Sequence, residues 1–101
     1  MWYSAALLFE RIHPTRTDHA KEPLWEESVI LIDALSEEDA RKKAELFGKK
    51  EAISFRAISG ELVEWRLVEV MDTHEIQDRH LKSGTEVFSR FLNDRPTKNH
   101  P

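Results

Sequence analysis

Two stretches of this sequence carry apolar side chains at consecutive positions, and this pattern restricts the fold more than any other feature. Residues 2–12 (WYSAALLFERI) and residues 25–35 (WEESVILIDAL) are apolar at both even and odd positions. Successive side chains of a β-strand point to opposite faces, so each stretch predicts a strand that is covered on two sides. The fold must therefore supply cover for both faces of a sheet.

The rest of the chain offers little material for that cover. The 101 residues predict one domain, and 40 % are hydrophobic whereas 34 % are charged. The most strongly marked helix spans residues 36–48 (SEEDARKKAELFG), with Ser36 as N-cap, acidic residues in the first turn and Gly48 at the C′ position. Its apolar stripe is narrow, so we expect this helix to cover only part of the sheet. The stripe consists of Ala40, Ala44 and Phe47.

The middle of the chain predicts a β-hairpin. Residues 52–58 (AISFRAI) and 61–72 (ELVEWRLVEVMD) are joined by Ser59 and Gly60, a pair typical of tight turns. Alternation in the return strand predicts two faces. The first holds Val63, Trp65, Leu67 and Met71, and the second holds Leu62, Glu64, Arg66, Val68 and Val70.

The last part of the chain predicts a short helix and a final strand. Residues 72–84 (DTHEIQDRHLKSG) begin with a potential cap at Asp72, contain oppositely charged pairs four residues apart and end at Gly84. Residues 85–92 (TEVFSRFL) alternate as a strand does, and residues 93–101 predict a disordered tail.

The predicted fold class is α+β, in the order β-β-α-β-β-α-β. It has a mainly antiparallel sheet of about five strands, one main helix packed on one face, and a single domain over residues 1–92. Residues 13–24 form a long polar loop that is either mobile or functional. Two strands with two apolar faces have more apolar surface than one clearly predicted helix and one weakly predicted helix can cover. Either the short helix and the long loop cover the second face, or a second copy of the protein does.

Several classes of function are disfavoured by composition. The chain has no cysteine, which excludes disulfide scaffolds, thiolate metal sites and cysteine nucleophiles, and which suits the cytoplasm. Its net charge of −4, with both signs interspersed, argues against nucleic acid or an anionic membrane as partner. The N-terminal stretch lacks the basic region of a signal peptide, and we expect a soluble cytoplasmic protein. The histidine spacing indicates no metal site, three glycines offer no phosphate-binding loop, and no cofactor is expected.

Glu26 and Glu27 are adjacent in the sequence, but adjacent positions in a strand do not form a catalytic carboxylate pair. Neighbours in a strand point to opposite faces, so the two carboxylates cannot share a proton unless a bulge separates them. Alternation places Glu27 on the face of Trp25. Other strand glutamates form a looser constellation, which either supplies a general acid or cation site or pairs with arginines across strands. These are Glu10, Glu64, Glu69 and Glu86, and cross-strand pairing is the favoured interpretation.

Five short motifs together resemble a known family. WYSAALLFE (2–10), EES (26–28), GELVEW (60–65), DTHEI (72–76) and GTEVFSR (84–90) are similar, in order and spacing, to the bacterial domain-of-unknown-function family 4288. The resemblance covers residues 2 to about 92, with Phe88 where the family often has tyrosine. It implies a compact, stand-alone bacterial cytoplasmic domain and no particular reaction. The matched positions most worth testing are Glu27, Trp65, Glu86 and Arg90.

These observations favour a non-enzymatic module that binds a protein partner or a second copy of itself. The doubly apolar strands and the lack of a convergent catalytic set motivate this hypothesis. The alternative is a small hydrolase or metal-dependent enzyme that uses strand carboxylates, such as Glu86 with Glu64 or Glu27. Paired-carboxylate chemistry would require two of these groups in one concave site.

Overall fold

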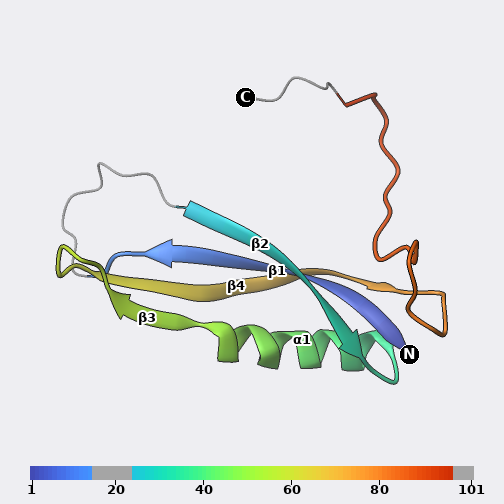
Figure 1. Cartoon of the computed structure of the whole chain (residues 1–101), viewed down its shortest axis with the longest axis horizontal. Coiled ribbons are helices and arrows are strands. Elements are labelled where there is room, and N and C mark those ends of the chain that lie inside the picture. The colour runs from blue at the N-terminus through green and yellow to red at the C-terminus, as the bar shows by residue number, and fades with distance from the viewer. Residues whose placement is uncertain (15–23, 97–101) are drawn as a thin grey trace.

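A computed structural model describes residues 1–14 and 24–96 and shows an α+β fold (Figure 1). Within these residues one helix packs on a four-stranded antiparallel sheet with strand order β2-β1-β4-β3. The elements in chain order are β1 (Trp2–Ile12), β2 (Leu24–Asp33), α1 (Glu37–Glu51), β3 (Ile53–Arg56) and β4 (Leu62–Glu75). The predicted fold class and antiparallel sheet are confirmed. The predicted loop over residues 13–24 falls largely on residues 15–23, which lie outside the described residues.

The strand β1 forms the centre of the sheet because it has neighbours on both sides. It pairs with β2 along almost its whole length and with β4 from Tyr3 to Ile12. Its odd-numbered side chains, from Tyr3 to Phe9, are buried against α1. The sequence predicts cover on both sides of residues 2–12, but in the described part of the chain a helix covers only the side that holds these odd-numbered residues.

The helix α1 begins as its sequence predicts and ends later. The Ser36 hydroxyl accepts a hydrogen bond from the Asp39 N–H at 3.1 Å, and the Asp39 carboxylate accepts one from the Leu35 N–H at 3.0 Å. The prediction that Gly48 ends the helix is wrong, because α1 continues to Glu51. A Cβ atom at Gly48 would lie 2.9 Å from both methyl carbons of Leu67 on β4, so this glycine permits close approach of helix and sheet.

The predicted hairpin is present, with β3 and β4 joined by a tight turn. Gly60 adopts a positive φ of 85°, and the Ala57 N–H donates to the Glu61 carbonyl at 2.8 Å. The predicted faces of β4 are only partly right. The register against β1 shifts between Ala6 and Leu7 and again between Leu8 and Phe9.

These two irregularities leave Val68 and Met71 without direct partners in the ladder and change which residues share a face. Val70 lies opposite Leu7 and packs against the core, whereas Met71 lines a hollow on the other side of the sheet. Strict alternation along β4 predicts that Met71 shares a face with Trp65 and Leu67. This prediction is wrong because the register shifts move Met71 to the opposite face.

The predicted short helix over residues 72–84 is absent, because its first four residues belong to β4. Tyr3, Ser4, Ala5 and Ala6 of β1 lie opposite Glu75, His74, Thr73 and Asp72. The Ile76 N–H then donates to the Trp2 carbonyl at 2.8 Å, and Ile76 is buried. Pairing along the whole of β1 outweighs the local helix signals of this segment.

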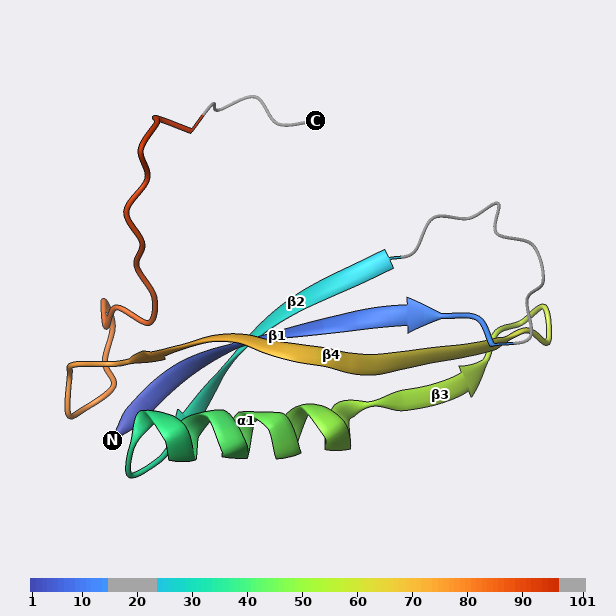
Figure 2. The same ribbon diagram turned by 180° about the vertical axis from the view of Figure 1, so that it is seen from behind.

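The predicted fifth strand over residues 85–92 is also absent from the described structure. This C-terminal segment follows a turn at Gly84, whose φ is 91°, and runs without a neighbouring strand. It leaves the sheet beyond the end of β4, as Figures 1 and 2 show from opposite sides. Strand-like alternation alone cannot stabilise a strand that has no ladder partner. Residues 93–96 continue without regular structure, and residues 97–101 of the predicted tail lie outside the described residues.

The core lies on one face of the sheet, between the sheet and α1. Ala40 and Ala44 of the helix have no exposed surface and contact the buried residues of β1 and β2. The opposite face, which we call the open face, has no helix over it in the described part of the chain. Its exposed apolar residues include Trp25, Val29, Leu31 and Met71. The short predicted helix is therefore unavailable as a cover for this face.

Candidate functional site

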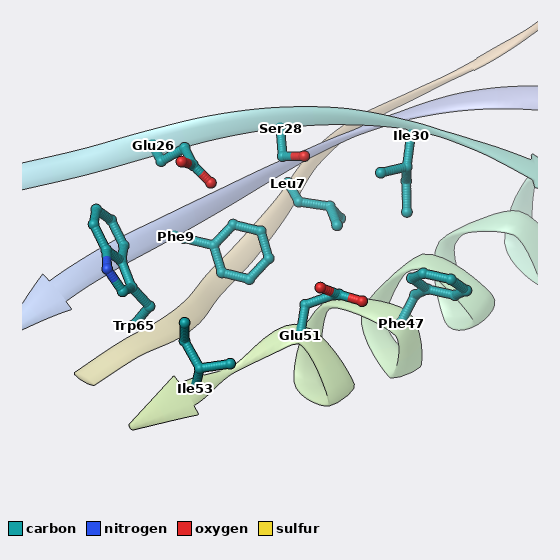
Figure 3. Close-up of a pocket in the computed structure, with 9 residues that line it drawn as sticks. All are labelled: Leu7, Phe9, Glu26, Ser28, Ile30, Phe47, Glu51, Ile53 and Trp65. Carbon is teal, nitrogen blue, oxygen red and sulfur yellow. The ribbon is translucent and has the colours of Figure 1, made fainter. Parts of the chain in front are cut away.

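A cavity of about 390 Å³ lies on the helix side of the sheet, where α1 ends and the sheet continues (Figure 3). Its volume is within the range of small-molecule sites in proteins. We call it the helix-side cavity. Its described lining residues come from all five elements and are Leu7, Phe9, Glu26, Ser28, Ile30, Phe47, Glu51, Ile53 and Trp65.

The floor and walls of the helix-side cavity are hydrophobic. Leu7 and Phe9 of β1 form a buried floor, with exposed fractions of 1 % and 6 %. Trp65 of β4 stands beside Phe9, and Ile30 of β2 lies toward α1 (Figure 3). The narrow apolar stripe of α1 explains the cavity, because small alanines bring one part of the helix close to the sheet and leave the neighbouring part uncovered.

Two carboxylates reach this cavity from opposite sides. Glu26 extends from β2, and Glu51 extends from the last turn of α1 (Figure 3). Within residues 1–14 and 24–96, neither carboxylate has an ion-pair or hydrogen-bond partner. The C-terminal end of a helix carries a partial negative charge, and Lys49 and Lys50 in the last turn of α1 oppose it. The cavity is therefore hydrophobic in its lining and negative in its electrostatic character.

A second hollow, which we call the open-face pocket, lies on the other side of the sheet and has a volume of about 270 Å³. Small residues of the central strand, Ser4 and Ala6, form its floor between the larger side chains of β2 and β4. The C-terminal segment borders it with Val87 and Phe88, and the Phe88 ring meets the His74 ring edge-on at 6.3 Å. The remaining described lining consists of Glu27, Val29, Met71, Asp72 and His74.

The two hollows show that the adjacent glutamates of β2 point to opposite faces. Glu26 lines the helix-side cavity, whereas Glu27 lines the open-face pocket. The ladder between β1 and β2 runs without a register shift, so strand alternation holds throughout. The prediction that these two carboxylates cannot act as a pair is confirmed.

The four candidate residues taken from the sequence do not gather in one place. Glu27 lies in the open-face pocket and Trp65 in the helix-side cavity, while Glu86 and Arg90 are exposed on the C-terminal segment. Their functional roles stay predictions. Sequence reasoning did not identify Glu51 as a residue of this cavity, although a carboxylate at a helix end just before an apolar strand is a signal that could have suggested it.

The charged residues at the other end of α1 form a separate structural group. Burial raises the pKa of the Tyr3 hydroxyl above its ordinary value, and the carboxylates of Glu75, Glu37 and Asp39 act in the same direction. The Leu35 N–H, by donating a hydrogen bond, lowers the pKa of Asp39, and Lys43 adds to this effect.

Across the described residues, no group of three or more His, Asp or Glu side chains is placed to hold a metal ion.

The carboxylates named for an enzyme do not share a described cavity. Glu27 is the only one of Glu27, Glu64 and Glu86 among the described lining residues of either hollow. Glu10 lies directly opposite Arg66 in the β1–β4 ladder, the placement expected of a cross-strand charge pair.

In the described part of the chain, α1 is too short and too polar to cross a membrane.

The fold and its two hollows define a small α+β domain whose antiparallel sheet carries a helix on one face. The family model described as Domain of unknown function (DUF4288) matches residues 2–89, and the chain belongs to this family. This match confirms the resemblance carried by the five short motifs. Comparison with curated proteins and with solved structures finds no match.

Proposed function

We propose that this chain is a non-enzymatic protein-interaction module that associates with itself, two copies pairing along their β2 strands. The observation that carries the proposal is the position of β2, a strand of 10 residues at the edge of the sheet. Over the described residues it has a neighbouring strand on one side only. The cysteine-free composition supports the further proposal that the module works in the cytoplasm.

The outer edge of β2 has few of the features that usually prevent pairing. An edge strand presents unpaired N–H and C=O groups, and soluble proteins protect such edges with proline, lysine, bulges or very short strands. The stretch Leu24–Asp33 contains no proline or lysine and pairs with β1 without a bulge. On the open face, Val29 is 53 % exposed and Leu31 is 46 % exposed. This edge is therefore suited to pairing with another strand.

The charges of β2 favour a second antiparallel copy. An antiparallel pair centred on Val29 places Glu27 opposite Leu31 of the second copy and Glu26 opposite Ile32. No two carboxylates then lie directly opposite each other, and side chains that share a face stay on that face. A parallel pair would bring glutamates of the two copies side by side, which is unfavourable. Antiparallel pairing also has the two-fold symmetry of the commonest homodimers.

Pairing along β2 would join the open faces of two copies into one larger surface. Trp25 is 54 % exposed on this face and would lie near the junction. Buried tryptophans are frequent anchors of protein interfaces. Pairing therefore satisfies the unpaired backbone groups at the outer edge of β2, and it doubles the apolar surface of the open face.

Sedimentation velocity over a range from low micromolar to near-millimolar concentration tests the proposal. We expect the wild-type chain to sediment as a dimer at the upper end. The substitution Val29→Lys places two like charges at the two-fold axis and should leave a monomer. The matched control is Val68→Lys on β4, a strand inside the sheet, where Val68 is 48 % exposed. This control should dimerise like the wild type.

A mixing experiment separates a specific interface from general repulsion. Val29→Glu alone should also be monomeric, but an equimolar mixture with Val29→Lys should recover a dimer by pairing opposite charges. A wild-type chain that remains monomeric throughout refutes the proposal. Equal effects of Val29→Lys and Val68→Lys refute the assignment to β2.

A further inference from the structure

We propose that the helix-side cavity binds a small organic cation, namely a primary amine or guanidine carried on a hydrophobic body. This site is distinct from the outer edge of β2, and the proposal does not rest on self-association. Three features of the cavity carry it: the sign of its charges, the nature of its walls and its size.

The charge of the cavity selects for a cation. Among the described lining residues, the charged groups are Glu26 and Glu51, which belong to different elements. The described lining contains no lysine, arginine or histidine. A ligand ammonium placed between the two carboxylates would donate charge-assisted hydrogen bonds to both, and such bonds are stronger than neutral ones. An anionic ligand would be repelled by both carboxylates.

The walls of the cavity select for a hydrophobic body with aromatic contacts. Phe9 and Leu7 are almost fully buried beneath it, and Trp65 stands at its side (Figure 3). The faces of tryptophan and phenylalanine rings attract cations as well as apolar groups. Phe47 and Ile53, at 51 % and 54 % exposure, flank the cavity and would lose solvent contact when a ligand enters.

The size of the cavity points to a small molecule. A volume of about 390 Å³ is near the lower end of the range for ligand pockets. It accommodates one ring with a short alkylamine, and Ser28 adds a hydroxyl that can accept a hydrogen bond. The occupant to which the proposal commits is therefore a free arylalkylamine or arylalkylguanidine.

Three ligands of almost the same shape test the proposal by calorimetry and by amide chemical shifts. The probe is 2-phenylethylamine, and the comparison ligands are 2-phenylethanol, which is neutral, and 3-phenylpropionate, which is an anion. We expect the amine to bind at least about tenfold more tightly than the alcohol, because charge-assisted hydrogen bonds are stronger than neutral ones. The anion should not bind. Shifts should concentrate on residues that line the helix-side cavity.

The adjacent glutamates of β2 supply a matched pair of variants. Glu26→Gln should weaken binding of 2-phenylethylamine about fivefold, whereas Glu27→Gln, on the other face of the same strand, should leave it unchanged. A second pair lies on α1, where Glu51→Gln should weaken binding and Glu45→Gln should not, because Glu45 pairs with Lys49 at 3.5 Å. These glutamates are exposed, so the variants should fold normally.

Other results would overturn the proposal. Equal binding of amine and alcohol would show a merely hydrophobic groove, and equal losses for Glu26→Gln and Glu27→Gln would place the ligand elsewhere. No detectable binding of the amine at millimolar concentration would reject the site. The same titration on Val29→Lys keeps this test separate from dimerisation, since that substitution lies on the open face and leaves the cavity lining intact.

Discussion

The contact between Gly48 of α1 and Leu67 of β4 yields a prediction whose size follows from the structure. An alanine is about 1 kcal/mol more favourable than glycine inside a helix. A Cβ atom at position 48 would, however, lie 2.9 Å from both methyl carbons of Leu67, well inside the optimal carbon–carbon separation. Overpacking of this kind costs about 1–3 kcal/mol. We therefore expect Gly48→Ala to lower the free energy of unfolding by about 1 kcal/mol.

A double-mutant cycle with Leu67→Ala isolates this contact. Leu67 is partly buried, and its truncation should cost about 2 kcal/mol, the low end for leucine. With the methyl groups gone, Gly48→Ala should instead stabilise the protein by its helix propensity of about 1 kcal/mol. The coupling free energy between the two positions is then about 2 kcal/mol.

Urea unfolding followed by circular dichroism measures all four variants of the cycle. A control cycle replaces Leu67→Ala by Leu46→Ala, because Leu46 is 62 % exposed on α1 and should not couple to position 48. If Gly48→Ala stabilises the otherwise unaltered protein by about 1 kcal/mol, the helix does not approach β4 as closely as the structure indicates. Close packing of α1 against Leu67 at Gly48 would then be refuted.

Two further predictions concern the buried face of β1, which holds Tyr3 and Leu7. Leu7→Ala should lower the free energy of unfolding by about 3 kcal/mol, because Leu7 is 1 % exposed and its removal enlarges a cavity. Chemical denaturation measures this change, and a loss below about 1 kcal/mol would contradict the prediction. Tyr3 is the single tyrosine of the chain, so tyrosinate absorbance reports on it alone, and its titration should lie above the ordinary pKa of 10.0. Because folding raises the pKa of Tyr3, the contribution of its neutral hydroxyl to the free energy of unfolding is complete below the ordinary pKa of 10.0. This contribution is lost as the pH rises through the pKa of the folded protein. A titration midpoint at or below 10.0 would contradict the prediction.

Much of the fold could be predicted because its signals are local. The N-cap at Ser36, the acidic first turn of α1 and the turn at Gly60 act through neighbouring residues, and each appears as expected. Strand alternation is a property of the backbone itself. It therefore placed Glu26 and Glu27 on opposite faces without knowledge of the strand order.

The wrong predictions share a different physical origin. Residues 72–75 carry helix signals, but they lie beside β1 and satisfy its hydrogen bonds as part of β4. Residues 85–92 alternate like a strand, yet a strand exists only where a neighbour pairs with it. Register shifts in β4 exchanged the faces of Val70 and Met71, and such bulges have no clear signature in this sequence.

The sequence by itself determined the class of fold, the main elements and the faces of β1 and β2, because each depends on residues close together along the chain. Tertiary structure alone decided that β2 lies at an edge and that Glu26 and Glu51 reach one cavity over Phe9 and Trp65. These residues are distant in the chain, and strand order and helix packing bring them together. That order depends on the total free energy of pairing and burial over the whole domain, which no local pattern contains.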